Sequence, residues 1–196
     1  MKTLLLFDFD GTLTKEDTLF TFTKYYHGAF KFALGIMILS PILILHIFKI
    51  IPNQKAKEFF LTFFFKNVDI ELFNKRGGNF SSVIETIIRP KAQIELSKHK
   101  ALGDQITIVT ASPENWVKPW CDLNGFHCIG TKLEVIDGRI TGKIAGLNCF
   151  GAEKKNRIKS EFDLSLFDEI VAFGDSVGDL EMLNLAHRKF YKPFRK

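Results

Sequence analysis

The sequence predicts an α/β protein built on a parallel sheet. Three short apolar runs without a helix breaker, at 4–7, 105–110 and 169–173, are typical of buried strands. Helical patterns separate these runs, and strands that alternate with helices form parallel sheets with right-handed crossovers. Each run is followed by polar side chains, and ligands bind at the carboxyl ends of the strands in such sheets. The sequence therefore places a functional site at that edge.

Length, charge and cysteine content narrow the class of protein. A chain of 196 residues forms one domain, or one domain with an insertion. The net charge of +5 suits anionic substrates or a membrane surface, but no basic run is dense enough to predict a nucleic-acid partner. The three cysteines are odd in number and never spaced as C-x-x-C, which argues against disulfides and zinc and favours the cytoplasm. The oligomeric state is not predicted.

The first strand ends in two carboxylates. Asp8 and Asp10 stand at positions i and i+2, so they project from the same face, and Gly11 lets the backbone turn out of the sheet. Two carboxylates ~5 Å apart repel by roughly 3 kcal/mol at an effective dielectric of 20, so a bound cation is expected there. The alternative is an acidic turn that caps the next helix.

Residues 15–89 are predicted to be helices inserted after the first strand. Apart from an apolar segment discussed next, the expected helices cover about 15–27, 53–66 and 70–80. The last of them is expected to stop near Gly77-Gly78, and Arg89-Pro90 marks a boundary. We therefore expect one domain from 1–14 and 90–196, and a helical cap from 15–89.

The segment 32–51 is almost wholly apolar. Its length meets the requirement for a membrane span, but a single crossing would separate strands that share one sheet. Two short helices that meet near Ser40-Pro41 are expected instead, because proline interrupts a helix. Three interpretations stay open, namely a buried core of the cap, a contact with the membrane interface, and a true span.

The remainder of the chain alternates strands and helices. Ser112 and Pro113 are expected to be the N-cap and first residue of a helix, and Asp137-Gly138 predicts the turn of a hairpin. The predicted elements are helices at about 91–102, 112–123, 152–161 and 177–186, strands at 105–110, 169–173 and 189–191, and a hairpin at 131–144.

Polar residues at the strand ends form a chemically consistent set. Asp8 and Asp10 supply carboxylates, Thr110 and Ser112 supply hydroxyls, and Asp175 follows the third strand, while Lys154 supplies a cation. Phosphoryl transfer needs such a set, because its catalysis is mostly positioning and charge stabilisation. A carboxylate can accept the phosphoryl group, and Mg²⁺ prefers oxygen ligands.

These motifs resemble the haloacid dehalogenase-like hydrolase superfamily, in the branch around phosphoserine phosphatase. The motifs are DFDGTLT at 8–14 with its preceding strand, Ile108-Val109-Thr110, Gly151-Ala152-Glu153-Lys154 and the run from Gly174 to Asp179. The resemblance implies a Rossmann-like parallel sheet with helices on both faces and an inserted all-helical cap.

The resemblance also implies roles for individual residues. Asp8 would be the nucleophile and Asp10 the general acid and then base, while Thr110 and Lys154 would bind and screen the phosphate. The implied substrate-binding residues are Gly11, Asp17, Ala111 and Ser112. The implied Mg²⁺ ligands are Asp8, Asp10 through its backbone carbonyl, and Asp175, with Asp179 supporting them.

The expected activity is Mg²⁺-dependent hydrolysis of a small phosphorylated metabolite through an aspartyl-phosphate. Two departures weaken phosphoserine itself as the substrate: the cap has no arginine at the expected place, and Gly178 stands where that branch has asparagine. The chain also resembles a sub-branch with an apolar cap that includes phosphatidylglycerophosphate phosphatases. A membrane-associated phospholipid-phosphate phosphatase, docked peripherally on an anionic membrane through Lys31, Lys49, Lys55 and Lys57, and a phosphotransferase stay open as alternatives.

Overall fold

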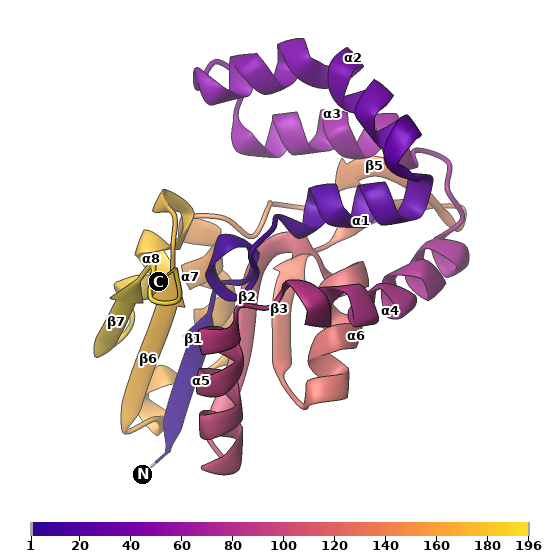
Figure 1. Cartoon of the computed structure of the whole chain (residues 1–196). Coiled ribbons are helices and arrows are strands. Elements are labelled where there is room, and N and C mark those ends of the chain that lie inside the picture. Colours follow the sequence, from indigo (N-terminus) through magenta and orange to yellow (C-terminus); the bar gives the residue numbers. More distant parts are fainter. Residues whose placement is uncertain (1, 196) are drawn as a thin grey trace.

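The predicted parallel sheet is present. The computed structural model describes residues 2–195, and within them five strands pair in the order β3-β2-β1-β6-β7, all parallel (Figure 1). A two-stranded antiparallel hairpin, β4-β5, lies outside this sheet. The strands are β1 (Thr3–Phe7), β2 (Gln105–Pro113), β3 (His127–Thr131), β4 (Leu133–Ile136), β5 (Arg139–Ile144), β6 (Glu169–Gly174) and β7 (Arg188–Tyr191).

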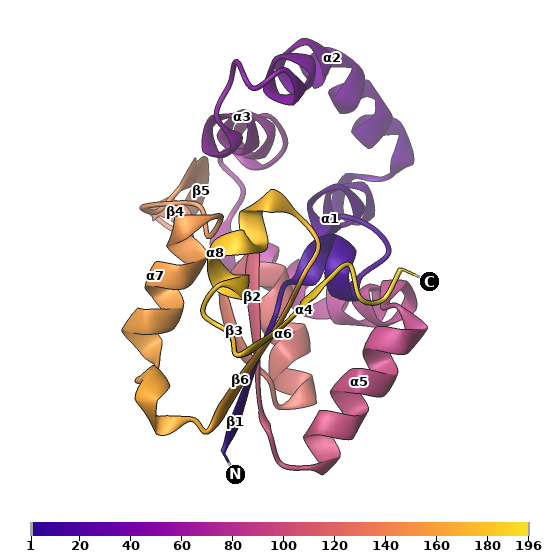
Figure 2. The ribbon, with the colours of Figure 1, turned by 90° about the vertical axis from the view of Figure 1, so that its left-hand side faces the viewer.

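Helices cover both faces of the sheet, as predicted. Successive side chains of β1 point to opposite faces. Leu5 and Phe7 join a cluster with α5 (Pro90–Ala101) and α6 (Glu114–Asn124), whereas Leu4 and Leu6 join a second cluster with α7 (Ala152–Glu161) and α8 (Leu180–Leu183). Figure 2 shows α5 and α7 on opposite sides of the strands. All of β1 is buried, which explains its continuous apolar run.

Four further helices lie between β1 and α5 in the sequence, at the carboxyl end of the sheet (Figure 1). They are α1 (Thr18–His27), α2 (Ala29–Ile47), α3 (Asn53–Phe65) and α4 (Ile70–Ile87). Asp17 caps α1, since its side chain accepts a hydrogen bond from the Leu19 N–H at 2.9 Å. Buried aromatic rings join these helices to α6, with Phe22 stacked on Trp116 at a centroid distance of 4.5 Å.

The expectation of two helices meeting at Ser40-Pro41 is wrong, because α2 is one continuous helix of 19 residues. Pro41 has no N–H for the carbonyl of Met37, four residues earlier. The Ser40 hydroxyl instead donates to the Met37 carbonyl at 2.8 Å. A side-chain donor thus replaces the missing backbone donor, and the helix continues.

Most of α2 is not buried, so the interpretation of 32–51 as a buried core is wrong for this helix. Of the residues in α2, all of which the structure describes, only Gly35 and Leu39 are buried. Among residues 2–195, α2 is the one helix that is long and apolar enough to cross a membrane, judged by length and composition.

The expected end of a helix at Gly77-Gly78 is also wrong, since α4 runs on to Ile87. Gly77 packs against the start of α6, where a Cβ would lie 2.1 Å from the Asn115 carbonyl oxygen. Glycine therefore permits two helices to approach closely at this point. The glycine pair thus marks a close contact between two helices and not the end of a helix.

The other differences concern element ends. Ser112 is not an N-cap, because β2 extends to Pro113 and α6 begins at Glu114. The strand β3 was not predicted, and the helix expected at 177–186 is a short 3₁₀ turn followed by the four residues of α8. The hairpin is confirmed, with Asp137 and Gly138 both at positive φ in its turn.

Candidate active site

The carboxyl ends of β1, β2 and β6 line a cavity of about 390 Å³, with α1, α2 and α3 on its other side. β1 lies between β2 and β6, where the strand order reverses, and open α/β sheets bind ligands at such a point. The cavity wall includes the predicted residues Asp8, Asp10, Asp17, Ala111, Ser112, Lys154, Asp175 and Asp179. Gly11 and Thr110 are not in the wall, but each lies next to a residue that is: Gly11 next to Asp175, and the Thr110 hydroxyl next to the Asp10 carboxylate.

Lys154 links three elements beneath the cavity. Its ammonium group donates to Asp8 Oδ1 at 2.6 Å, to the Val109 carbonyl at 2.7 Å and to Asp179 Oδ1 at 2.8 Å. Burial alone would lower the pKa of Lys154, but the two carboxylates raise it above its ordinary value. Lys154 is therefore a permanent cation, with all its donors used.

Asp8 has one carboxylate oxygen held and one unpartnered. Its Oδ1 accepts from Lys154, while no group among the described residues donates to Oδ2, although that atom is buried. Burial raises the pKa of Asp8 to about 7, against the lowering effect of Lys154. A buried carboxylate oxygen without a partner is costly, so this atom is suited to a ligand.

Asp10 is held differently from Asp8. Its Oδ1 accepts from the Thr18 N–H at 2.7 Å, and its Oδ2 accepts from the Ser112 hydroxyl at 2.6 Å. The Thr110 hydroxyl donates weakly to the same oxygen at 3.4 Å and accepts from the Ser112 N–H at 2.9 Å. The two carboxylates of the first motif are thus chemically distinct.

Three carboxylates converge close enough to hold a cation. One oxygen from each of Asp8, Asp175 and Asp179 lies within 4.8 Å of the others. Asp179 Oδ2 already accepts from the N–H groups of Asp175 and Ser176 at 3.1 and 2.9 Å, and its Oδ1 accepts from Lys154. Asp179 therefore orients the turn after β6, which leaves Asp8 and Asp175 as the freer ligands.

Gly11 is required by geometry. Its φ of +81° lies in the left-handed region, and a Cβ there would lie 2.6 Å from Asp175 Oδ2. Any side chain at this position would push the β1 turn away from the turn after β6. Gly11 thus lets the two carboxylate-bearing turns meet.

A comparison of the chain with known protein families agrees with this arrangement of site residues. The chain matches the haloacid dehalogenase-like hydrolases over residues 5–184, a range that includes every predicted site residue. The chain belongs to that family. The prediction that it is an enzyme is thereby confirmed.

Individual relatives and solved structures match nearly the whole chain. Protein CicA of Caulobacter vibrioides is 35% identical over 198 residues, spanning 98% of this chain and 86% of that protein. The structure of a Bordetella pertussis protein of unknown function has a TM-score of 0.83 at 25% identity, covering 96% of this chain and 89% of that one. A substrate-bound phosphoserine phosphatase has a TM-score of 0.70 at 18% identity, covering 97% and 86%. The predicted family and the likeness in fold to that branch are confirmed.

Lys57 is a site residue of this haloacid dehalogenase-like hydrolase that the sequence did not reveal as such. It was expected on the outer surface with other lysines, but it points into the cavity from α3. Its ammonium donates to the Ala111 carbonyl at 2.9 Å and to Asn148 Oδ1 at 3.1 Å. Burial lowers the pKa of Lys57 to about 8, and burial beside Asp10 raises the pKa of Asp17 to about 6. The spacing of the lysines along the sequence of α3 does not reveal which of them faces the cavity.

Two further contacts were not predicted. Arg195, after β7, pairs with Asp175 Oδ2. Phe150 lines the cavity and packs on Gly178, where a Cβ would lie 2.3 Å from the ring. The glycine that departs from the phosphoserine phosphatase pattern therefore makes room for an aromatic wall. Both contacts join segments far apart in the chain.

Proposed function

We propose that this hydrolase is a Mg²⁺-dependent phosphomonoesterase that acts through an aspartyl-phosphate on Asp8. The observation that carries the proposal is the asymmetry of the Asp8 carboxylate, with Oδ1 held by Lys154 and Oδ2 buried without a partner among the described residues. A nucleophilic carboxylate needs one oxygen free to attack and a fixed orientation.

The residues present fit a magnesium ion. Asp8 and Asp175 offer carboxylate oxygens within 4.8 Å of each other, and Mg²⁺ uses one or two carboxylates together with water and substrate phosphate. Asp8, Asp175 and the Asp10 carbonyl would hold the ion, and Asp179 would support it. When bound, the ion would neutralise the charge that builds up on the phosphoryl oxygens.

The side chains of Asp8, Asp10 and Lys154 have separate roles in the reaction. Asp8 Oδ2 forms a bond to phosphorus while the bond from phosphorus to the ester oxygen breaks, and the Asp10 carboxyl gives its proton to the departing alkoxide. Asp10 then removes a proton from the water that attacks phosphorus, which breaks the Asp8–phosphorus bond and releases phosphate. Lys154 stabilises the Asp8 carboxylate and the phosphate throughout, because it stays charged.

The test is to replace Asp8. We expect Asp8→Asn to lower kcat on a generic phosphomonoester by on the order of 10⁴-fold. Wild-type protein quenched in acid during turnover should carry phosphate on the peptide that contains Asp8, as detected by mass spectrometry. Asp122→Asn is the matched control, since Asp122 pairs with Lys118 on the surface. Equal activity of Asp8→Asn and wild type would contradict the proposal.

The substrate class follows from the cavity above Asp8. A volume of about 390 Å³ suits a small phosphorylated metabolite, and residues 15–89 would form a cap over the core formed by 1–14 and 90–196. Lys57 and Asp17 place one charge of each sign toward the leaving group. We expect Lys57→Met to raise KM at least tenfold for substrates with a second anionic group and to leave neutral alkyl phosphates nearly unchanged.

A second candidate substrate is a lipid phosphate, favoured by the apolar part of the wall. Leu19, Phe20, Leu43, Phe60 and Phe150 supply the apolar part of the cavity lining. Apolar walls bind substrates with an apolar leaving group. The two candidates separate in a comparison of kcat/KM for short-chain phospholipid monoesters and for soluble sugar or amino-acid phosphates, assayed at equal Mg²⁺.

A further inference from the structure

One face of α2 carries an unbroken apolar stripe that no described part of the chain covers. Positions 30, 34, 37, 41, 44 and 48 follow one another at intervals of four and three residues, so they lie on one side of the helix. All six side chains are exposed. The most exposed apolar side chains of α2 and the turn after it are each more than half exposed: Phe30, Met37, Ile38, Ile47, Phe48 and Ile50.

The opposite face of α2 already has its partner. Gly35 lies against the Phe64 ring of α3, where a Cβ would be 2.2 Å from the nearest ring atom, and Leu39 is buried. The helix is therefore seated on the protein by one side. The exposed stripe is therefore not the face by which α2 packs on the rest of the described protein.

The distribution of charged residues along the chain indicates what kind of partner binds the stripe. Residues 18–57 contain five lysines and no acidic residue, so the rest of the chain carries equal numbers of basic and acidic residues, 22 of each. The whole net charge of +5 therefore resides in the segment that carries the stripe. Lys31 and Lys49 are exposed and flank the stripe at its two ends, and Lys55 is exposed on α3.

This arrangement disfavours a second copy of the chain as the occupant. A symmetric dimer through α2 would bring two copies of the same basic segment together, and like charges repel. An anionic lipid surface presents negative headgroups at the level of the lysines and acyl chains at the level of the apolar residues.

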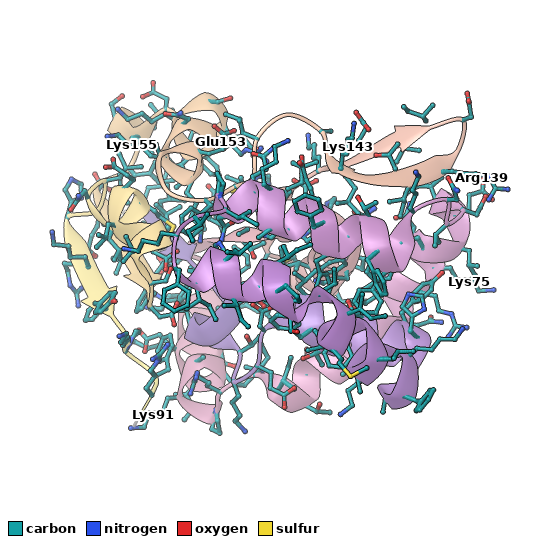
Figure 3. All side chains as sticks on the ribbon, turned by 90° about the horizontal axis from the view of Figure 1, so that it is seen from above. Lys75, Lys91, Arg139, Lys143, Glu153 and Lys155 are labelled. Atoms are coloured by element: carbon teal, nitrogen blue, oxygen red, sulfur yellow. The ribbon has the colours of Figure 1, made fainter. Side chains whose placement is uncertain are left out.

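The topology favours lying on a bilayer over crossing it. β1 and β2 pair directly in one sheet although α2 lies between them in the sequence, so the chain on both sides of α2 stays on one side of the membrane. Figure 3, seen from above, has α2 and α3 nearest the viewer, with Arg139 and Lys143 of β5 at the edge of the view. The outer side of the molecule thus presents the apolar helix α2, and the exposed Lys31 and Lys49 are next to its stripe in the sequence.

We infer that the exposed stripe of α2, with the turn at Phe48–Ile50, is a docking surface for an anionic membrane. The helix lies in the plane of the interface, with Lys31 and Lys49 at the headgroups. Because α2 also lines the cavity with Leu43 and His46, docking places the cavity beside the bilayer. The inference concerns binding and does not depend on the proposed catalytic mechanism.

Vesicle flotation of the full chain tests the inference. Vesicles of phosphatidylcholine with phosphatidylglycerol should carry the protein upward, with an affinity about tenfold or more above that for phosphatidylcholine alone. The double variant Met37→Gln/Phe48→Gln should bind about tenfold more weakly or not at all, because both side chains leave water on docking. Lys31→Glu/Lys49→Glu should remove the preference for anionic lipid.

Controls separate docking from folding and from catalysis. Leu123→Gln changes an equally exposed apolar residue at the end of α6 and should float like wild type. Asp8→Asn should also float like wild type, since it affects only the proposed nucleophile. Unchanged circular dichroism shows that the α2 variants are folded. The inference is overturned if wild type does not float, if the α2 variants float equally well, or if sedimentation shows a dimer that Met37→Gln/Phe48→Gln dissociates.

Discussion

At the scale of single residues, Lys154 is the group on which the buried charges depend. It neutralises Asp8 and Asp179, and both ion pairs are removed from water. Removal of one member of a buried pair leaves an uncompensated charge, which costs more than the pair itself contributes. Lys154 is therefore expected to act in stability as well as in catalysis.

Lys154→Met should lower the free energy of unfolding of the metal-free protein at neutral pH by about 3 kcal/mol, measured by urea denaturation. Lys155→Met is the matched control at the next position, where the lysine makes a partly exposed pair with Glu181 at 3.0 Å. Its effect should stay within about 0.5 kcal/mol. Similar losses for both variants would contradict the assignment of Lys154.

The raised pKa of Asp8 predicts a pH dependence of metal binding. Because its pKa is about 7, Asp8 in the metal-free protein holds a proton below that pH. A metal ligand must be ionised, so Mg²⁺ displaces this proton, and the apparent affinity should fall about tenfold per pH unit below 7 and level off above it. Calorimetry in buffers of different ionisation enthalpy should detect about one proton released below pH 7. An affinity that does not change with pH would rule this out.

At the scale of elements, the pair Gly77-Gly78 separates a packing role from a helix propensity. Gly77 faces the Asn115 carbonyl, whereas a Cβ on Gly78 would meet nothing within 4 Å. The helix packing therefore requires glycine at position 77, whereas position 78 has room for a side chain.

Gly77→Ala should destabilise the protein by about 2 kcal/mol or more, because α4 must move away from α6. Gly78→Ala should stabilise it by up to about 1 kcal/mol, since alanine has the higher helix propensity. Thermal unfolding of the two variants gives the comparison. If both changes shift Tm in the same direction, the close approach of α4 and α6 is not what requires Gly77.

At the scale of the whole molecule, the site is assembled from turns that the sheet brings together. Asp8 and Asp175 directly follow β1 and β6, and Ser112 lies near the end of the neighbouring strand β2. Lys154 reaches Asp8 from α7. Arg195 adds a contact from the segment after β7, since its guanidinium pairs with Asp175. Arg195 therefore occupies a carboxylate oxygen of Asp175, which is an expected metal ligand.

Arg195→Gln should therefore raise the apparent affinity for Mg²⁺ by roughly fivefold, the equivalent of one partly exposed ion pair of about 1 kcal/mol. A calorimetric titration of the protein with Mg²⁺ measures this change directly. Arg188→Gln, which removes a surface pair with Glu169, is the control and should leave the affinity unchanged. A loss of affinity in Arg195→Gln would show that the arginine supports the site.

Much of the fold and the core of the site could be predicted because their signals are local. A buried parallel strand requires a continuous apolar run, and the polar residues just after each strand must share one edge of the sheet. Asp8, Asp10, Thr110 and Asp175 were predicted at this edge in this way, and Lys154 was predicted to join them from the start of a helix. The two strands of the hairpin followed from the turn at Asp137-Gly138.

Tertiary structure alone decided the rest, because each remaining feature depends on a neighbour distant in the sequence. The inward direction of Lys57 depends on the Ala111 carbonyl, and the role of Gly77 depends on Asn115. An apolar helix has the same composition whether it is buried or exposed, so only the packing of Gly35 on Phe64 determined which side of α2 faces outward. The sequence by itself determined which polar residues follow the strands, and the tertiary structure decided which surfaces lie beside them.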